Sequence, residues 1–191
     1  MSVLARAIDW GDRLPLLVGR AVHLRMLEES DLGRLYDIFG DAQVVRYWSS
    51  PPIADLAAAR ALLEEIHDCF RLRTLFQWGI ADRGDDRLLG TITLHRLDLD
   101  HARAEVGFAL ARDAWRRGAA TDALGTLLRF AFDELGLHRI EADTDPRNER
   151  SIRLLERHGF QREGLLRERY HVLGEWQDAV LFGLLAAAWR R

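Results

Sequence analysis

The sequence predicts a mixed α/β (α+β) domain whose sheet is mostly antiparallel, with about seven strands flanked by about four helices. Two observations predict this class. Runs of alternating apolar and polar residues, which are typical of strands, occur in groups separated by short turns. Longer runs with apolar residues at a 3.6-residue spacing, which are typical of amphipathic helices, interrupt those groups. At 191 residues the chain has the length of one domain, and it shows no internal repeat or linker.

The first 19 residues show no sustained period and are expected to form an N-terminal arm before a domain over residues 20–191. The first half of that domain is expected to contain a strand, two helices and a hairpin of two strands. Ser30 is the expected cap of the first helix, and Pro51-Pro52 precedes the second. Residues 82–85 have the composition of a hairpin turn. The expected ranges are 21–26, 30–39, 55–71, 75–81 and 88–97.

The second half is expected to alternate strands with helices and to end in a hairpin. Its first strand places Val106 and Phe108 on one face and Glu105 on the other. Gly136 is expected to end the long helix that follows, and Gly159 the shorter one after it. The expected strands are 103–110, 138–144, 160–170 and 176–185, and the expected helices run from about 120 to 135 and from 148 to 158.

Charge and composition exclude several classes of function. The formal net charge is −3 and the acidic and basic residues are interspersed, which argues against nucleic-acid binding. No apolar run approaches the roughly 20 residues that span a bilayer, and the start lacks a signal-peptide core, so we expect a cytoplasmic protein without a membrane partner. All 27 basic residues are arginine, which leaves no lysine to act as a nucleophile or to bind phosphate. We predict no metal site.

The most informative stretch is Trp-Arg-Arg-Gly-Ala-Ala-Thr, residues 115–121, which joins a predicted strand to a predicted helix. The first N–H groups of a helix have no partner within it, and the aligned peptide dipoles add about half a positive charge there. Gly118, Ala119 and Ala120 have little or no side chain, so a diphosphate can approach the backbone. The G-x-G-x-x-G of a dinucleotide-binding fold and the lysine of a P-loop are both absent. The loop therefore predicts a site for an anion.

A second segment, Asn148-Glu149-Arg150-Ser151, opens the next helix one strand later. Together the two segments resemble the GNAT superfamily of acetyl-CoA-dependent N-acetyltransferases, and within it the ribosomal-protein N-terminal acetyltransferase (RimJ/RimL) type. The matching segments keep their order and spacing, and the resemblance covers about residues 20–187. The segments that carry it are 104–108, 115–123, 145–151, 158–160 and 174–178.

This resemblance implies a single GNAT-type domain with acetyl-CoA as the acetyl donor. The backbone of residues 108–110, splayed from the next strand by a bulge, would pair with the pantetheine arm. Backbone amides of residues 116–121 would hold the diphosphate, with two arginines adding positive charge. Asn148 would reach the pantetheine, although its simpler interpretation is a helix cap. The implied cofactor-binding residues are Phe108, Ala109, Leu110, Arg116, Arg117, Gly118, Ala119, Ala120, Thr121, Asn148 and Ser151.

Acyl transfer to an amine needs a group that removes a proton from the ammonium form, and a carboxylate near the acetyl group can do this directly or through water. Glu105 is the first candidate, because it lies on the strand that holds the cofactor. A solvated strand residue paired with an arginine is the alternative interpretation of Glu105. Asp143, at the end of the following strand, is the second candidate for the base.

The thiolate that leaves also needs a proton. Many GNAT relatives have a tyrosine at the position of Leu155, and this chain departs from that pattern. Ser151 lies on the same helix face, and the resemblance to the RimJ/RimL type implies that its hydroxyl serves instead. A second capping hydroxyl is the alternative interpretation of Ser151.

The expected acceptor is a primary amine, in the first place a protein or peptide N-terminus, which attacks directly in a ternary complex. A small amine such as a polyamine, an amino acid or an aminoglycoside-like drug is the alternative, and a non-catalytic acyl-CoA-binding module is a third. Exposed sheet edges and the apolar tail 184–189 are compatible with a homodimer. The candidates to line the acceptor pocket are Tyr47, Trp48, Trp78, His95, Tyr170 and His171.

Overall fold

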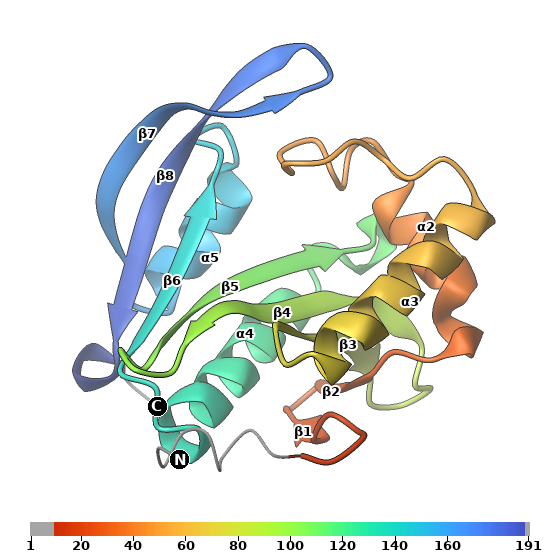
Figure 1. The fold of residues 1–191 in the computed structure, drawn as a ribbon, viewed down its shortest axis with the longest axis horizontal. Helices are drawn as coiled ribbons and strands as arrows, with labels where there is room; N and C mark the ends of the chain where they lie inside the picture. Colours follow the sequence, from red (N-terminus) through yellow and green to blue (C-terminus); the bar gives the residue numbers. More distant parts are fainter. Residues whose placement is uncertain (1–9, 190–191) are drawn as a thin grey trace.

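Eight strands form one sheet in the order β1-β2-β3-β4-β5-β6-β8-β7 in the computed structural model, which describes residues 10–189 (Figure 1). All neighbouring strands are antiparallel except β5 and β6, which are parallel. The seven expected strands are all present, and β1 is an additional two-residue strand within the expected arm. Residues 1–9 of that arm lie outside the described residues. The strands are β1 Leu17–Val18, β2 Val22–Met26, β3 Leu75–Asp82, β4 Leu88–Asp98, β5 Arg103–Leu110, β6 Arg139–Thr144, β7 Gln161–Val172 and β8 Glu175–Leu185.

Four α-helices cover the two faces of the sheet, as expected. The buried residues of α2 and α3, apart from Phe70, form one apolar cluster with part of β4 and β5, whereas those of α4 and α5 join the larger cluster on the opposite face. No helix within residues 10–189 is long and apolar enough to cross a membrane. The helices are α2 Leu32–Phe39, α3 Leu56–Arg71, α4 Ala119–Arg129 and α5 Glu149–Arg157, and α4 continues as a π-helical turn over Phe130–Glu134.

The cap expected at Ser30 is wrong. A 3₁₀ turn, η1 (Glu29–Asp31), precedes α2, and Glu28 and Asp31 form a reciprocal capping box across it. The carboxylate of Asp31 accepts the backbone N–H of Glu28 at 2.9 Å and is also held by Arg25 of β2 at 2.8 Å. The charged partner on β2 therefore decides where this helix begins, and a local capping pattern could not show it.

β5 and β6 pair over only three residues each and then separate. Pairing joins residues 103–105 to residues 139–141 and stops there. Beyond that point β5 continues beside β4, while β6 pairs with β8 as far as Thr144. Figure 1 shows the two strands side by side at one end and apart at the other. The bulge expected at this separation is wrong, because the register shift of this region lies in β4, between His95 and Asp98.

Asp122 ties the beginning of α4 to the beginning of β2. Its carboxylate accepts the backbone N–H groups of Arg20, Ala21 and Val22 at 3.0, 2.7 and 3.0 Å. Gly19 lies so close that a Cβ there would be 2.7 Å from the Asp122 carboxylate. Burial raises the pKa of Asp122, but the three N–H donors outweigh burial and hold that pKa below its ordinary value of 3.8.

We expect Asp122→Ala to lower the free energy of unfolding by about 2 kcal/mol, because three N–H groups lose a charged acceptor. In the wild type this stabilisation is complete above the unfolded pKa of about 3.9 and is lost as the pH falls through the lower folded pKa. Urea unfolding between pH 3 and pH 7 measures both effects. Asp37→Ala is the control, since Asp37 is an exposed helical carboxylate that pairs only with Arg34. Equal losses in the two variants would contradict this role of Asp122.

Candidate active site

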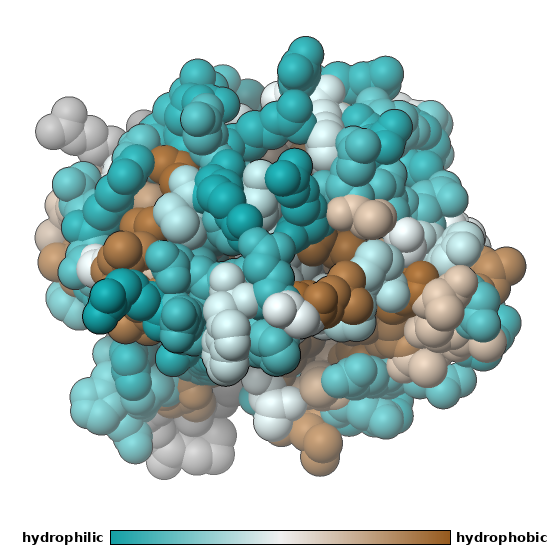
Figure 2. Space-filling view, turned by 90° about the horizontal axis from the view of Figure 1, so that it is seen from above, coloured by the Kyte–Doolittle hydropathy of each residue, from teal (hydrophilic) through white to brown (hydrophobic). Residues whose placement is uncertain are grey.

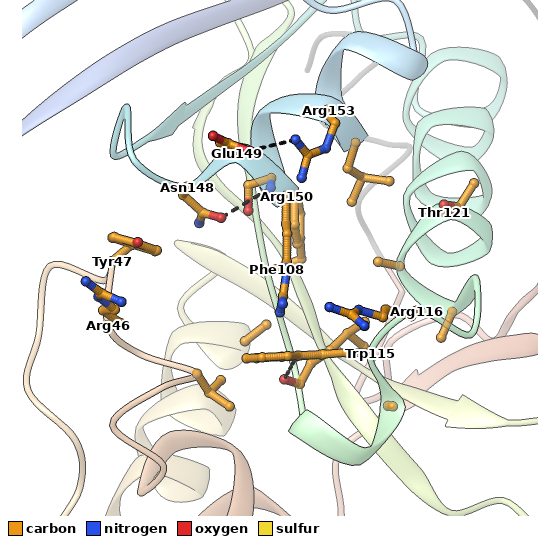
Figure 3. Close-up of a pocket in the computed structure, with 18 of the residues that line it drawn as sticks. Arg46, Tyr47, Phe108, Trp115, Arg116, Thr121, Asn148, Glu149, Arg150 and Arg153 are labelled. Atoms are coloured by element: carbon orange, nitrogen blue, oxygen red, sulfur yellow. Dashed lines mark hydrogen bonds and ion pairs between the residues drawn. The ribbon is translucent and has the colours of Figure 1, made fainter.

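A cleft of about 940 Å³ lies beside the end of β5, between the loop into α4, the start of α5 and residues 43–48 (Figure 3). Ten of the eleven expected cofactor-binding residues line this cleft, and Arg117 is the exception. Arg117 is exposed outside the lining. Segments far apart in the sequence thus meet where β5 and β6 part.

The loop into α4 presents backbone N–H groups to the cleft. Arg116 and Gly118 both have positive φ angles, 64° and 82°, which turn the chain sharply into the helix. The first bond of α4 runs from the Asp122 N–H to the Gly118 carbonyl. Within residues 10–189, no acceptor is present for the N–H groups of Ala119, Ala120 and Thr121. A diphosphate bound here would therefore meet unpaired donors at the positive end of a helix.

The charges around the cleft favour an anionic ligand. Six arginines line it against a single carboxylate, Glu149, and that carboxylate pairs with Arg153 at 2.8 Å. Arg147 is held by Asp145 and Glu175, each at 2.6 Å, whereas no ion pair engages Arg116 in the described part of the chain. The described residues contain no group of three His, Cys, Asp or Glu side chains that could hold a metal ion. Backbone amides and arginines are thus the groups of this cleft that could bind a phosphate.

Trp115 joins the end of β5 to the start of α5. Its indole N–H donates to the Leu110 carbonyl at 2.8 Å, and the Arg150 guanidinium lies 4.6 Å from the centre of its ring. Figure 3 shows Arg150 reaching from the helix toward the flat indole. The sequence pointed to the segment containing Arg150 but not to this contact, because a cation–π pair between separate elements has no local signal.

The backbone of β5 has one free edge beyond the separation. The Ala111 N–H donates to the Leu89 carbonyl, so alternation turns the backbone groups of Ala109 toward β4 and those of Phe108 and Leu110 toward the open side. The Leu110 carbonyl already accepts the indole N–H of Trp115. The Phe108 N–H and carbonyl and the Leu110 N–H remain available to an extended ligand.

Asn148 and Ser151 lie together at the start of α5. The Asn148 side-chain oxygen accepts the Ser151 backbone N–H at 3.2 Å, so the capping interpretation of Asn148 is confirmed. Both residues also line the cleft, and the amide nitrogen of Asn148 is not used by the cap. Leu155 is 1% exposed and belongs to the core below them. Ser151 is thus the residue of α5 that brings a hydroxyl to the lining of the cleft.

Glu105 lies at the closed end of the separation and does not line the cleft. One of its oxygens accepts from Arg96 at 2.8 Å, and the other is 3.6 Å from Nε2 of His95. Arg96 was not foreseen, because it contacts Glu105 only through a left-handed backbone angle, φ 49°, at the register shift in β4. The pairing with an arginine, part of the alternative interpretation of Glu105, is confirmed, although its side chain is only 13% exposed and is not solvated. The role of Glu105 as a base stays a prediction.

Asp143 accepts a hydrogen bond from the hairpin that β7 and β8 form. The Tyr170 hydroxyl donates to its carboxylate at 2.6 Å. Burial and this carboxylate both raise the pKa of Tyr170. In β7, residues 167–169 face the single residue Asp178 of β8, so the strand has two extra residues just before Tyr170. An even number of extra residues leaves Tyr170 on the same face of the sheet as Leu166.

The six candidates for the acceptor pocket divide into four groups. Tyr47 and Trp48 line the cleft, and His95 and Tyr170 flank the two carboxylates. His171 stacks on Trp176 with ring centres 4.6 Å apart, in the hairpin. The prediction for Trp78 is wrong, because this residue is fully buried in the core and donates its indole N–H to the Pro15 carbonyl.

The face on which the hairpin and the loop after α2 approach each other is mainly hydrophilic, with small hydrophobic areas between the polar side chains (Figure 2). This surface suits an acceptor that arrives from water with a polar or charged group.

Comparisons with known proteins agree with this geometry. The model of the acetyltransferase (GNAT) domain matches residues 21–161. N-acetyltransferase p20 of Bacillus licheniformis, an uncharacterized protein, is 34% identical over 162 residues, which are 85% of this chain and 91% of that protein. The structure of a spermidine N-acetyltransferase from Vibrio cholerae in complex with CoA and spermine has the same fold, with a TM-score of 0.78 at 23% identity, covering 88% of this chain and 97% of that one.

Relatives with a named acceptor differ among themselves. A spermidine N(1)-acetyltransferase of Escherichia coli is 27% identical over 84% of this chain and 83% of its own length. A Bacillus subtilis protein named provisionally as a ribosomal N-acetyltransferase, YdaF, is 37% identical over 55% of this chain and 57% of its own length. The family model covers most of the chain, and the open edge of β5 and the free loop amides form one cleft. The chain therefore belongs to the GNAT acetyltransferase family, as an N-acetyltransferase with acetyl-CoA as its acetyl donor.

Proposed function

We propose that this enzyme acetylates the α-amino group of a protein or peptide N-terminus, and that it is of the RimJ/RimL type. The motifs named above and the likeness to YdaF support this assignment. The cleft carries the proposal, because the free edge of β5 and the free amides of the α4 loop open into it together.

The reaction in this proposal is a direct attack in a ternary complex. The diphosphate of acetyl-CoA binds the N–H groups of Ala119, Ala120 and Thr121 with Arg116 nearby, and the pantetheine runs along the free edge of β5. Backbone N–H groups of that edge polarise the thioester carbonyl. Proximity and this polarisation supply most of the rate, because they act on the bond that changes.

Proton transfer completes the proposed mechanism. Glu105 assists deprotonation of the amine through an intervening group, since Arg96 binds it and it does not line the cleft. The Ser151 hydroxyl protonates the departing thiolate, in the place of the tyrosine that Leu155 replaces. The carboxylate of Asp143 is the second candidate for the base.

A small amine is the alternative acceptor. The likeness to spermidine N(1)-acetyltransferase over most of the chain favours it. The expected homodimer and cytoplasmic location stay predictions. The tail that suggested a dimer is partly used within the chain, since Leu184 is buried and Trp189 packs its ring on Phe132.

We expect Ala120→Asp to weaken acetyl-CoA binding at least about tenfold, because it puts a carboxylate beside the proposed diphosphate position. Ala57→Asp is the matched control. Both alanines are the second residue of a helix, where an acidic residue stabilises the fold. Titration calorimetry measures the affinity. Equal affinity in both variants would contradict this site, and no binding by the wild type would overturn the proposed function.

The acceptor class is tested by thiol release from acetyl-CoA with a panel of peptides and small amines. We expect the highest kcat/KM with peptides whose α-amino group is free, and loss of the reaction when that group is blocked. Spermidine or another small amine as the best substrate would establish the alternative. Cofactor binding without transfer to any amine would identify a non-catalytic acyl-CoA-binding module.

We expect Glu105→Gln to lower kcat/KM about tenfold near pH 7 and to leave acetyl-CoA affinity unchanged. The loss shrinks as the pH approaches the pKa of the substrate amine, because a neutral amine needs no base. Steady-state rates from pH 6 to pH 9 measure this dependence. Glu64→Gln, an exposed carboxylate of α3, is the control. An unchanged pH–rate profile would exclude Glu105 from the deprotonation step.

A further inference from the structure

Five titratable or charged side chains from four strands meet where β5 and β6 part. We call them the His95 cluster. β4 contributes His95 and Arg96, β5 contributes Glu105, β6 contributes Asp143 and β7 contributes Tyr170. The imidazole of His95 is the member without an assigned partner, because no described residue lies within hydrogen-bonding distance of its ring, and Glu105 at 3.6 Å is the nearest carboxylate.

The backbone of β4 is built to bring two consecutive residues to one carboxylate. In a regular strand, neighbouring side chains point to opposite faces. The register shift after His95 and the left-handed angle of Arg96 break this alternation. His95 and Arg96 therefore approach Glu105 together, and Arg96 occupies one oxygen and leaves the other facing the imidazole.

The ring of His95 extends over Gly107, toward the end where the strands separate. A Cβ at Gly107 would lie 4.0 Å from Nε2 of His95, so the glycine leaves the space beside this nitrogen open. Gly107 precedes Phe108, whose backbone groups face the open side. Nε2 thus lies beside the residue that precedes Phe108. His95, like Glu105, does not itself line the cleft, so the proton of the substrate amine would reach Nε2 through water.

The surroundings of His95 favour the neutral form of its ring, which can accept a proton. Burial lowers the pKa of His95 and outweighs the carboxylates of Glu105 and Asp143, which raise it; Arg96 lowers it further. The imidazole is therefore neutral near pH 7. The remaining member of the cluster, Tyr170, is held by Asp143 through its hydroxyl. Glu105 and Asp143 stabilise the imidazolium once it forms.

We propose that Nε2 of His95 takes the proton from the substrate ammonium, and that Glu105, fixed by Arg96, is the positioning residue that stabilises the resulting imidazolium. This inference rests on the proposed function, in which Glu105 acts through an intervening group. His95 is that group. The ammonium gives one proton to Nε2, and the neutral amine attacks the thioester carbonyl. The C–N bond forms and the C–S bond breaks. The Ser151 hydroxyl gives its proton to the departing thiolate and regains one from the nitrogen of the new amide, which loses its second proton in this step. The imidazolium then returns its proton to water.

The test compares His95→Gln with His101→Gln, a control that removes an exposed histidine from the turn between β4 and β5. We expect His95→Gln to lower kcat/KM about 100-fold near pH 7 with unchanged acetyl-CoA affinity. The wild-type rate should level off above the pKa of His95. The variant should lack this inflection and follow the free amine up to its own pKa, so that its loss nearly disappears at high pH. His101→Gln should keep the wild-type profile.

Two further variants separate catalysis from structure. The double variant His95→Gln with Glu105→Gln should be no slower than His95→Gln alone, because Glu105 acts through His95. Imidazole added to His95→Gly should restore part of the rate. A wild-type inflection retained in His95→Gln, or additive losses in the double variant, would overturn the proposal. These outcomes differ from failure of the proposed function, in which the wild type itself would not transfer acetyl groups.

Discussion

The separation of β5 from β6 after three paired residues is the constraint on which the rest of the active site depends. A strand inside a sheet satisfies its backbone groups on both edges, and a buried edge without partners is costly. β5 keeps β4 on one edge and loses β6 on the other, so Phe108 and Leu110 present backbone groups that a ligand can pair with. Trp115 takes one of them, the Leu110 carbonyl, and thereby ties the loop into α4 to the strand. In the proposed complex, the pantetheine would pair with the edge that the chain leaves open.

The second requirement is a set of donors for phosphate in a chain without lysine. Positive φ angles at Arg116 and Gly118 turn the loop so that the first amides of α4 face the cleft. The Asp122 carboxylate does not accept hydrogen bonds from these amides, because it accepts them from the backbone at the beginning of β2 instead. The same short segment therefore fastens α4 to the sheet and keeps its N-terminal amides free. Arginines around the cleft add charge where their own carboxylate partners are absent.

The His95 cluster lies at the closed end of the separation. Buried polar side chains in proteins rarely lack a hydrogen-bond partner. Arg96 pairs with Glu105 and Tyr170 pairs with Asp143, which leaves His95 between the two pairs with an unused lone pair. Irregular backbone in β4 creates the first of these pairs, since the register shift after His95 brings Arg96 to a carboxylate that a regular strand would put out of its reach. A regular β4 would not bring His95 and Arg96 to Glu105 together.

The sequence by itself determined the order of the elements and most of their bounds, and it predicted an anion site at the loop into α4. These follow from local physics: the period of apolar residues distinguishes strands from helices, and the small residues 118–120 at a helix start leave amides accessible. The other segments of the proposed cofactor site were expected from the resemblance to the GNAT superfamily. Only the tertiary structure decided that Trp78 is a core residue, that Arg25 sets the start of α2 through Asp31, and that Arg96 reaches Glu105. The reason is physical. Each of these facts is a contact between elements distant in sequence or a break in strand alternation, and the residues themselves have the same local patterns whether or not the contact forms.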